Sequence, residues 1–508
     1  MAIIWRPTII VVGAGIAGLT AGIRAEQNGF HAIVIESQPV VGGLCTGWYR
    51  KGRYLDGCIH WLTGSRKDTE LFKMWQNVRA FKDENDIIDL DTFGTYEYDG
   101  VQVPFYADVD KAEKTWLEIA PEDKKEIKKF FKMVRDFMSV ETPCNRPMNN
   151  LGLKTYLKVG VSVLKVWPSY LLTMKIDTDK YALKFKNPAI RNAIKLCQPG
   201  PGNLFSMLYS YSTITSKNGG IPKGGSKLFT ENMKEYFLEL GGTLKLSTEV
   251  KEIIVEKKKA VGVITNKGEE IRGDYVVTTI SPELVVNNLL DSKYKLNSFM
   301  KRFKKNNPVP TCCLLYYEVE DLPELDTQFT FQTKEFICGT QKFNHIGLRN
   351  YRYDPETYVK GNKTIVCVLI DQYDDDYFYW DNLYYSDKEG YYTFKEKLLK
   401  DVQDRIVDRF KELEGKITPL DISTPHTFKR YTNSSRGGFM SFLFTSKNSM
   451  YHAEKIRGVK NLYLAGQWVS SPGGVPFALM TGQHIIQKIC RKESVKCISL
   501  NNFKLVKN

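Results

Sequence analysis

The sequence predicts an α/β protein in which a Rossmann-type nucleotide-binding domain is interleaved with an α+β substrate domain. Three observations lead to this fold class. A glycine-rich strand–turn–helix unit opens the chain, a second unit of this kind closes it, and 508 residues are too many for one hydrophobic core.

The first unit has the pattern of a dinucleotide-binding βαβ motif. The apolar run Ile9–Val12 is followed by Gly13, Gly15 and Gly18 in G-x-G-x-x-G spacing, and the next strand-like run ends in Glu36. Gly13 permits a tight turn, Gly15 lets the backbone approach a pyrophosphate, and Gly18 lets helix and strand pack closely. The helix N-terminus favours the phosphates, and the carboxylate of Glu36 can accept hydrogen bonds from a ribose diol. A glycine-rich turn in an ordinary sheet would leave the acid unexplained.

Further glycine-rich segments identify a family resemblance. Gly42-Gly43-Leu44 and the element from Asp56 to Trp61 follow the first unit, and the strand 461–466 and the turn 473–476 lie near the other end. This ensemble resembles the flavin amine oxidase and phytoene desaturase superfamily, in particular its bacterial phytoene-desaturase-like and retinol-saturase-like branch. The resemblance implies a glutathione-reductase-like FAD domain, with the Gly-Gly pair against the nucleotide and the late helix N-terminus at the flavin ring.

The length of the cofactor independently favours FAD over NAD. FAD must be held at both ends, and the second strand–turn–helix unit suits the isoalloxazine end because its N–H groups can stabilise negative charge there. The alternative for 461–482 is an ordinary buried strand and helix. The residues expected to contact FAD are Gly13, Gly15, Ala17, Gly18, Glu36, Ser37, Gly42, Gly43, Leu44, His60, Val250, Gly466, Gly474, Val475 and Pro476.

The cofactor segments divide the chain into alternating pieces. We expect the FAD domain to comprise 1–75, 219–290 and 421–490, because 219–290 and 421–490 match segments that rejoin this domain in the resembled superfamily. The substrate domain would comprise a helical, basic part at 76–218 and a strand-rich part at 291–420, and a C-terminal tail would follow at 491–508.

Composition excludes several classes of protein. Hydrophobic and charged residues make up 42% and 26% of the chain, as in a folded globular protein. Ten cysteines without C-x-x-C pairs, six unclustered histidines and no recognisable signal peptide predict a cytoplasmic protein without a disulfide framework or a metal site. No nucleic-acid-binding module accompanies the net charge of +14.

Half of that excess charge lies in one tenth of the chain. Residues 151–200 contain nine Lys or Arg and two Asp, and Lys154, Lys158 and Lys165 share one face of a predicted helix that ends near Pro168. A basic amphipathic helix at 154–170 suits an anionic membrane surface, which would place the protein at the inner face of the membrane. The alternative is a helix packed on the substrate domain with a solvated lysine face.

Candidates for catalysis are few. His60 is the best titratable candidate because histidine exchanges protons near neutral pH, although a hydrogen-bonded structural histidine is an equal alternative. Gln467 and Trp468 follow Gly466 and are expected to line the pocket. The acidic, aromatic stretch 371–381 is expected to be a surface loop, and it lacks the spacing of an EF-hand calcium loop.

The residues and the resemblance together predict a FAD-dependent oxidoreductase of the desaturase, saturase or isomerase type. Its expected substrate is a long apolar polyene, isoprenoid or acyl chain that exchanges a hydride with flavin N5. Two alternatives stay open: a flavin amine oxidase, and a non-catalytic lipid-binding protein in which FAD serves only folding. Without a second G-x-G-x-x-G unit, the electron partner is expected to be oxygen, a quinone or a separate redox protein rather than a docked NAD(P)H.

Overall fold

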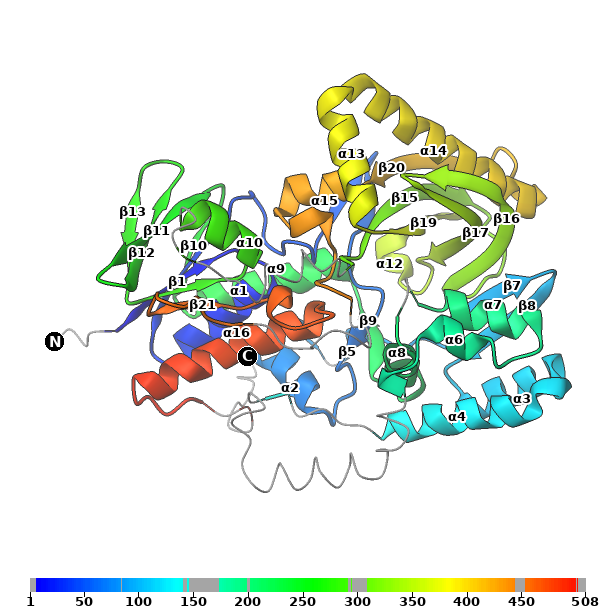
Figure 1. Cartoon of the computed structure of the whole chain (residues 1–508), viewed down its shortest axis with the longest axis horizontal. Coiled ribbons are helices and arrows are strands. Elements are labelled where there is room, and N and C mark those ends of the chain that lie inside the picture. The colour runs from blue at the N-terminus through cyan, green and yellow to red at the C-terminus, as the bar shows by residue number, and fades with distance from the viewer. Residues whose placement is uncertain are drawn as a thin grey trace.

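The protein is described by a computed structural model that covers residues 6–83, 85–139, 144–145, 173–198, 202–290, 294, 308–443, 453–498 and 500. Two regions lie side by side, one built on a parallel sheet and one on a larger mixed sheet (Figure 1). The predicted fold class, an α/β FAD-type domain interleaved with an α+β domain, is confirmed.

The parallel sheet collects strands from distant parts of the chain. Its order is β10 (Thr243–Lys245), β2 (His31–Ile35), β1 (Thr8–Val12), β14 (Tyr275–Thr278) and β21 (Leu462–Leu464). Every neighbouring pair is parallel. The sheet therefore brings both ends of the sequence to one edge, where ligands bind in folds of this class.

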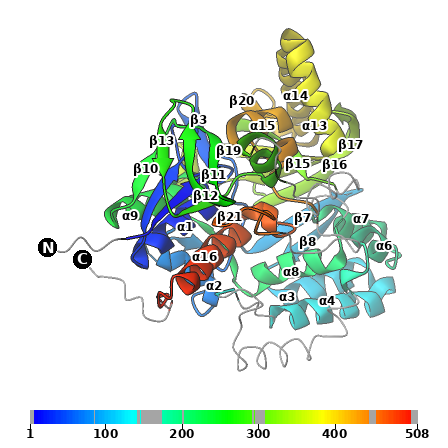
Figure 2. The same ribbon diagram turned by 60° about the vertical axis from the view of Figure 1, so that its left-hand side comes forward.

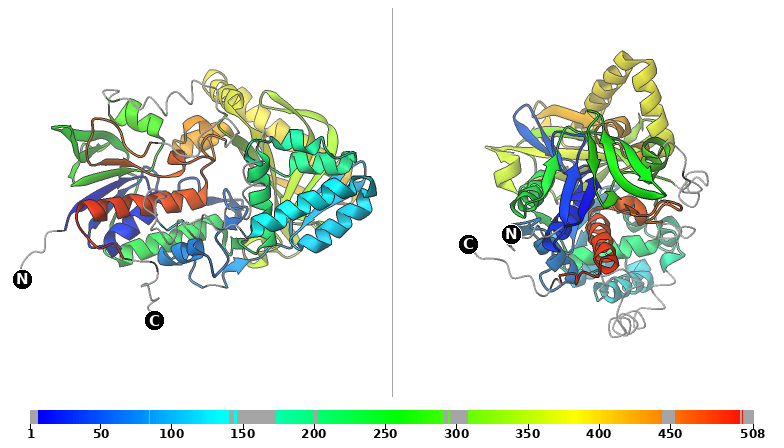
Figure 3. Two further views of the ribbon diagram at one scale, coloured as in Figure 1. Left: turned by 60° about the horizontal axis from the view of Figure 1, so that its bottom comes forward. Right: turned by 90° about the vertical axis from the view of Figure 1, so that its left-hand side faces the viewer.

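Both faces of this sheet are covered, as the continuous apolar runs of its strands require. Alternate residues such as Ile9 and Val11 pack against α1 (Ile16–Gln27), α9 (Gly225–Glu239) and α16 (Val475–Lys492). Their neighbours Ile10 and Val12 pack against a three-stranded antiparallel sheet of β11 (Val250–Glu256), β12 (Lys259–Thr265) and β13 (Glu270–Arg272). Figure 3 (left) shows α16 and the antiparallel sheet on opposite sides of the parallel strands.

The second sheet also joins distant segments. Its order is β20 (Ile417–Ser423), β15 (Thr311–Glu320), β19 (Lys363–Gln372), β17 (Gln341–Asn350), β16 (Gln328–Cys338), β7 (Thr92–Tyr98) and β8 (Val101–Tyr106), and β18 (Val359–Lys360) pairs with β19. Because β7 pairs with β16, residues before and after the second FAD-type segment share one sheet. The exact division of the chain into domains stays a prediction.

Helices cover this sheet from two sides (Figure 2). Trp380 of α13 (Asp374–Ser386) and Leu398 of α14 (Lys388–Arg409) pack on one face. Four helices surround Trp116 and Tyr211 beside β7 and β8, namely α3 (Val109–Ile119), α4 (Lys124–Met138), α7 (Pro188–Leu196) and α8 (Leu204–Thr215).

The remaining elements are short. They are β3 (Gly47–Arg50), β4 (Arg53–Asp56), β5 (Leu62–Thr63), α2 (Glu70–Asn77), β6 (Ile87–Ile88), α6 (Thr178–Ala182), β9 (Gly219–Pro222), α10 (Pro282–Leu284), α12 (Pro355–Tyr358) and α15 (Pro425–Thr432), with helical turns at 121–123, 285–289, 411–413, 435–437 and 467–469.

The prediction of a surface loop at 371–381 is wrong. This stretch is the end of β19 and the first two turns of α13, and Trp380 is fully buried. Asp376 is also buried because its carboxylate accepts hydrogen bonds from the Thr340 and Tyr373 amides at 2.8 and 3.1 Å. Acidic residues in the first turn of a helix complement its dipole, which explains the acidic composition that suggested a loop.

The basic segment 154–170 lies outside the described residues, so its fold is not part of this description. In the described part of the chain, no helix combines the length and the apolar character needed to cross a membrane.

Candidate functional site

A large cavity runs between the two regions of the molecule. Its volume is about 1120 Å³, more than one drug-sized ligand requires. It starts at the carboxyl ends of β1 and β2, passes the loops before α1 and α16, and continues between α8 and the second sheet. This path offers room for a dinucleotide and for a separate substrate.

At the first end of the cavity, the N-terminus of α1 has no side-chain cap. Gly15 is the N-cap residue and lines the cavity, and a Cβ there would lie at ordinary contact distance, 3.6 Å, from the carbonyl oxygen of Gly42. Gly13 has a φ of +101°, a conformation that favours glycine. The free N–H groups of this helix end can therefore bind the phosphates of a dinucleotide.

Glu36 is held rigidly beside this helix end. One carboxylate oxygen accepts a hydrogen bond from the Ala14 amide at 2.8 Å, and the other accepts from the Gln38 amide at 2.9 Å and the Ser37 hydroxyl at 3.1 Å. Glu36 and Ser37 both line the cavity, as does Val250 at the start of β11. A carboxylate oxygen has two lone pairs, so Glu36 retains acceptor capacity for a ribose hydroxyl.

The loop from Gly42 to Leu44 lies against the first glycine turn. The Gly42 amide donates to the carbonyl oxygen of Ala14 at 2.9 Å, and a Cβ on Gly43 would meet the Cα of Gly15 at 3.5 Å. The two glycine-containing segments can approach a common ligand because neither carries a side chain at the contact.

Asp56 fixes the next loop. Its carboxylate accepts hydrogen bonds from the Ser226 amide and hydroxyl at 2.5 and 2.7 Å, and from the Cys58 amide at 2.9 Å. Ser226 lies in the first turn of α9, so this buried acid ties the end of β4 to a helix N-terminus. The loop that follows presents Cys58, Ile59 and His60 to the cavity.

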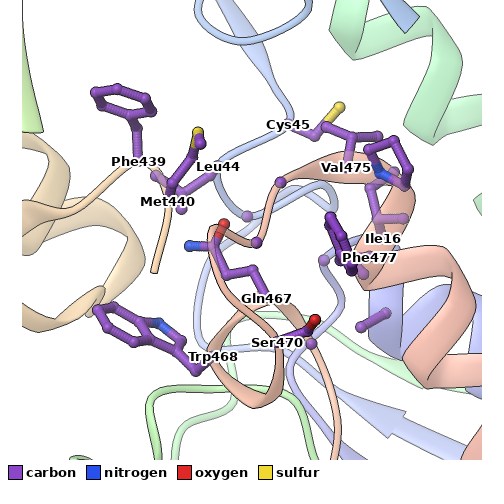
Figure 4. A pocket seen from close by; sticks show the side chains of 18 of the residues that line it. Ile16, Leu44, Cys45, Phe439, Met440, Gln467, Trp468, Ser470, Val475 and Phe477 are labelled. Carbon is purple, nitrogen blue, oxygen red and sulfur yellow. The ribbon is translucent and has the colours of Figure 1, made fainter. Parts of the chain in front are cut away.

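The N-terminus of α16 is the second uncapped helix end at the cavity. Gly474, with a φ of +92°, is its N-cap residue, and Val475 and Pro476 form its first turn. In Figure 4, Val475 lies near Ile16 of α1, and Gln467 and Trp468 project from the preceding loop. Two helix N-termini thus face one cavity, and both favour negative charge.

His60 lines the cavity, but its surroundings hold it neutral. Burial and the neighbouring Arg349 guanidinium lower the pKa of His60 to about 3. Arg349 approaches closely, because its Nη2 donates to the carbonyl oxygen of His60 at 2.8 Å. A neutral imidazole can hydrogen-bond a ligand, whereas a pKa this low makes it a poor proton acceptor near pH 7.

Sequence reasoning missed the contribution of α8. One face of this helix packs Met207 and Tyr211 into the hydrophobic core, and the other presents Phe205, Tyr209 and Thr213 to the cavity. The sequence of α8 does show an apolar stripe on one side of the helix and hydroxyl residues on the other. This pattern does not reveal what the hydroxyl side contacts.

The structure brings nearly all the predicted cofactor residues together. The cavity is lined by Gly13, Gly15, Ala17, Glu36, Ser37, Gly42, Gly43, Leu44, His60, Val250, Gly466, Gly474, Val475 and Pro476, and by Gln467 and Trp468. Gly18 lies behind the wall, where a Cβ would overlap the carbonyl oxygen of Gly13. Direct cofactor contact by each of these residues stays a prediction.

Comparison with known proteins identifies the family. The model of the family described as flavin containing amine oxidoreductase matches residues 16–489. The chain belongs to this family. It is therefore a FAD-dependent oxidoreductase, and the superfamily resemblance seen in the sequence is confirmed.

Individual relatives in this family are distant but cover almost the whole chain. The chain is 22% identical to a 4,4'-diaponeurosporene oxygenase of Staphylococcus aureus, over 96% of this chain and 98% of the relative. It is also 22% identical to a lycopene-forming phytoene desaturase of Paracoccus sp., over 92% and 94% of the two chains. Cyclohexylamine oxidase of Brevibacterium oxydans has a similar fold, with a TM-score of 0.57, 12% identity, and 96% and 100% of the chains covered.

The cavity fits the FAD of this family. The α1 helix end and Glu36 suit the phosphates and ribose, and Gly474 adds an open position where a Cβ would meet nothing within 4 Å. Bound FAD supplies a flavin N5 that accepts or donates a hydride. The residues that line the cavity would hold the two ends of the cofactor and shape the space beside it.

Proposed function

We propose that this oxidoreductase acts on a long apolar polyene or isoprenoid, which exchanges a hydride with the flavin. The observation that carries the proposal is the continuation of the cavity past the cofactor segments. There its wall is formed by Trp61, Phe205, Leu314, Leu369 and Phe428, from five different elements or loops. Such a wall suits an apolar chain and excludes water from the reacting carbon.

The names of the distant relatives support this substrate class. A diaponeurosporene oxygenase and a phytoene desaturase both take polyene isoprenoids as their names state, and each aligns with this chain over nearly its whole length. The similarity in fold to amine oxidases supports the shared architecture only, because identity there is 12%.

The test is anaerobic mixing of the purified FAD-loaded protein with an acyclic polyene in detergent micelles. We expect the visible flavin absorbance to bleach, or, in the saturase direction, chemically reduced protein to be reoxidised by the polyene. Rapid bleaching by cyclohexylamine without any response to the polyene would instead assign the protein as an amine oxidase. No response to either compound would favour the lipid-binding alternative.

We also propose that an anionic membrane delivers the substrate through 154–170. Met138 and Cys144 line the cavity and precede this basic segment in the chain. A polybasic helix binds anionic lipid with an affinity that falls as salt rises, which gives the proposal a direct test.

A further inference from the structure

Asp371 lies on the face of the second sheet that borders the cavity. It stands directly opposite Cys312 in the β15–β19 pair, and Leu369 precedes it by two positions on the same strand. Cys312 and Leu369 both line the cavity. Residues two apart on a strand, and directly opposite on neighbouring strands, share one face. Asp371 therefore shares the face that Cys312 and Leu369 present to the cavity, next to these lining residues.

The wall leads back to the cofactor side of the cavity. Pro310, two residues before Cys312, lines the cavity and accepts a hydrogen bond from the Phe439 amide at 3.2 Å. Phe439 and Met440 lie in the cavity close to Leu44 and Gln467 (Figure 4). A chain-like substrate that passes the flavin can therefore extend along β15 toward Asp371.

The carboxyl group of Asp371, a partly buried residue, lacks the partners that the buried acids Asp56 and Asp376 have. Its Oδ1 is buried without a hydrogen-bond partner, and no ion pair to Asp371 occurs among the described residues. By contrast, the buried carboxylates of Asp56 and Asp376 each accept several hydrogen bonds. An unpartnered polar group in a protein interior costs free energy, so Oδ1 of Asp371 is open to a partner that the protein itself does not supply.

The groups around Asp371 do not compensate its charge. Tyr96, Tyr373 and Cys312 interact with it electrostatically, and each has a pKa raised by burial, so each is neutral near pH 7. Burial also raises the pKa of Asp371 to about 7. The protonated and ionised forms coexist near neutral pH, and the protonated form can both donate and accept a hydrogen bond.

We propose that Asp371 binds an oxygen atom of the substrate, a hydroxyl or a carbonyl group carried by the polyene away from the reacting carbon. The inference rests on the proposed function and narrows it: the preferred substrate is an oxygenated isoprenoid rather than a pure hydrocarbon. A hydroxyl or carbonyl supplies the hydrogen bond that the protein itself leaves unmade. A site built to hydrogen-bond such a group discriminates strongly against an analogue without it.

The test compares two ligands of equal length, an acyclic C30 polyene hydrocarbon and its terminal alcohol. Binding to the oxidised, FAD-loaded protein is followed by the change in polyene absorption, which needs no turnover, and flavin bleaching is measured separately. We expect the parent to bind the alcohol about ten- to a hundredfold more tightly, the value of one hydrogen bond to a buried acid. Asp371→Leu should abolish this preference, and Asp371→Asn should retain part of it.

The matched control is Asp375→Leu, which removes the same charge from an exposed position of α13. It should preserve the preference for the alcohol, and the FAD content of all variants reports whether they fold. Equal binding of both polyenes by the parent, or an unchanged preference in Asp371→Leu and Asp371→Asn, would overturn the inference and leave the proposed function standing. Failure of both polyenes to bind or to affect the flavin would overturn the proposed function itself, and the inference with it.

Discussion

Replacing Asp371 by Asn is expected to stabilise the protein at alkaline pH. The pKa of Asp371 is about 7 in the folded protein, whereas the ordinary value for an aspartate, which we take for the unfolded chain, is 3.8. Between these two values the folded state holds a proton that the unfolded state releases. The parent therefore loses stability as pH rises from about 4 to about 7, and the loss is complete above pH 7. The difference between the two pKa values corresponds to at most about 4 kcal/mol.

The Asp371→Asn variant lacks this pH-dependent loss of stability because the asparagine side chain does not titrate. Near pH 4 the parent carries a neutral carboxyl group, so the two proteins should then have similar stability. At pH 8 the parent carries a buried charge without a partner, and the variant should unfold at a temperature several degrees higher.

The assay is thermal unfolding at pH 4.5, 6, 7 and 8, followed by tryptophan fluorescence, with the same saturating FAD concentration for both proteins. Equal ligand saturation is needed because bound FAD itself raises the unfolding temperature. The reasoning fails if the difference between variant and parent does not grow with pH, or if the variant is less stable at pH 8. Asp375→Asn, on the exposed side of α13, should show no such pH-dependent gain.

Three further predictions concern the cofactor, the histidine and the membrane. Gly15→Val should fold but lose FAD, since the branched side chain enters the cavity; a yellow variant with one FAD per chain would contradict this. His60→Ala should keep FAD and show the same pH dependence of flavin bleaching as the parent between pH 5 and 9, because a pKa of about 3 keeps this imidazole neutral. If the rate of flavin bleaching changes with pH in the parent and this change is lost in the variant, His60 transfers a proton. Lys154, Lys158 and Lys165 changed together to Glu should release the protein from anionic liposomes in co-sedimentation, and sedimentation equal to the parent's would exclude the membrane proposal.

The parts of the fold set by local patterns could be predicted from the sequence. The spacing of Gly13, Gly15 and Gly18 after an apolar run leads to β1 and α1 because each glycine meets a local steric need. The strand-rich character expected for 291–420 was also evident, and β15 to β19 lie in this range. The two glycine-rich units, one near each end of the chain, then led to the prediction of an interleaved α/β architecture.

Other features depend on contacts between distant residues. The stretch 371–381 looked like a loop because the partners of its acids, Thr340 and Gln341, lie more than 30 positions away. Asp371 was missed for the same reason, since its place beside the lining residue Cys312 follows from the pairing of β19 with β15. The neutral state of His60 likewise depends on its burial by the folded chain and on Arg349, which comes from another part of the chain.

The interleaving of strands has a consequence for synthesis on the ribosome. The parallel sheet begins with residues 8–12, but its last strand, β21, ends at Leu464. The helix end at Gly474, which lines the same cavity as the end of β1, is made later still. Contacts so far apart in sequence form slowly, and a nascent chain with exposed strand edges is prone to aggregate. FAD bound in this cavity would therefore stabilise the fold only after the last segments have been made.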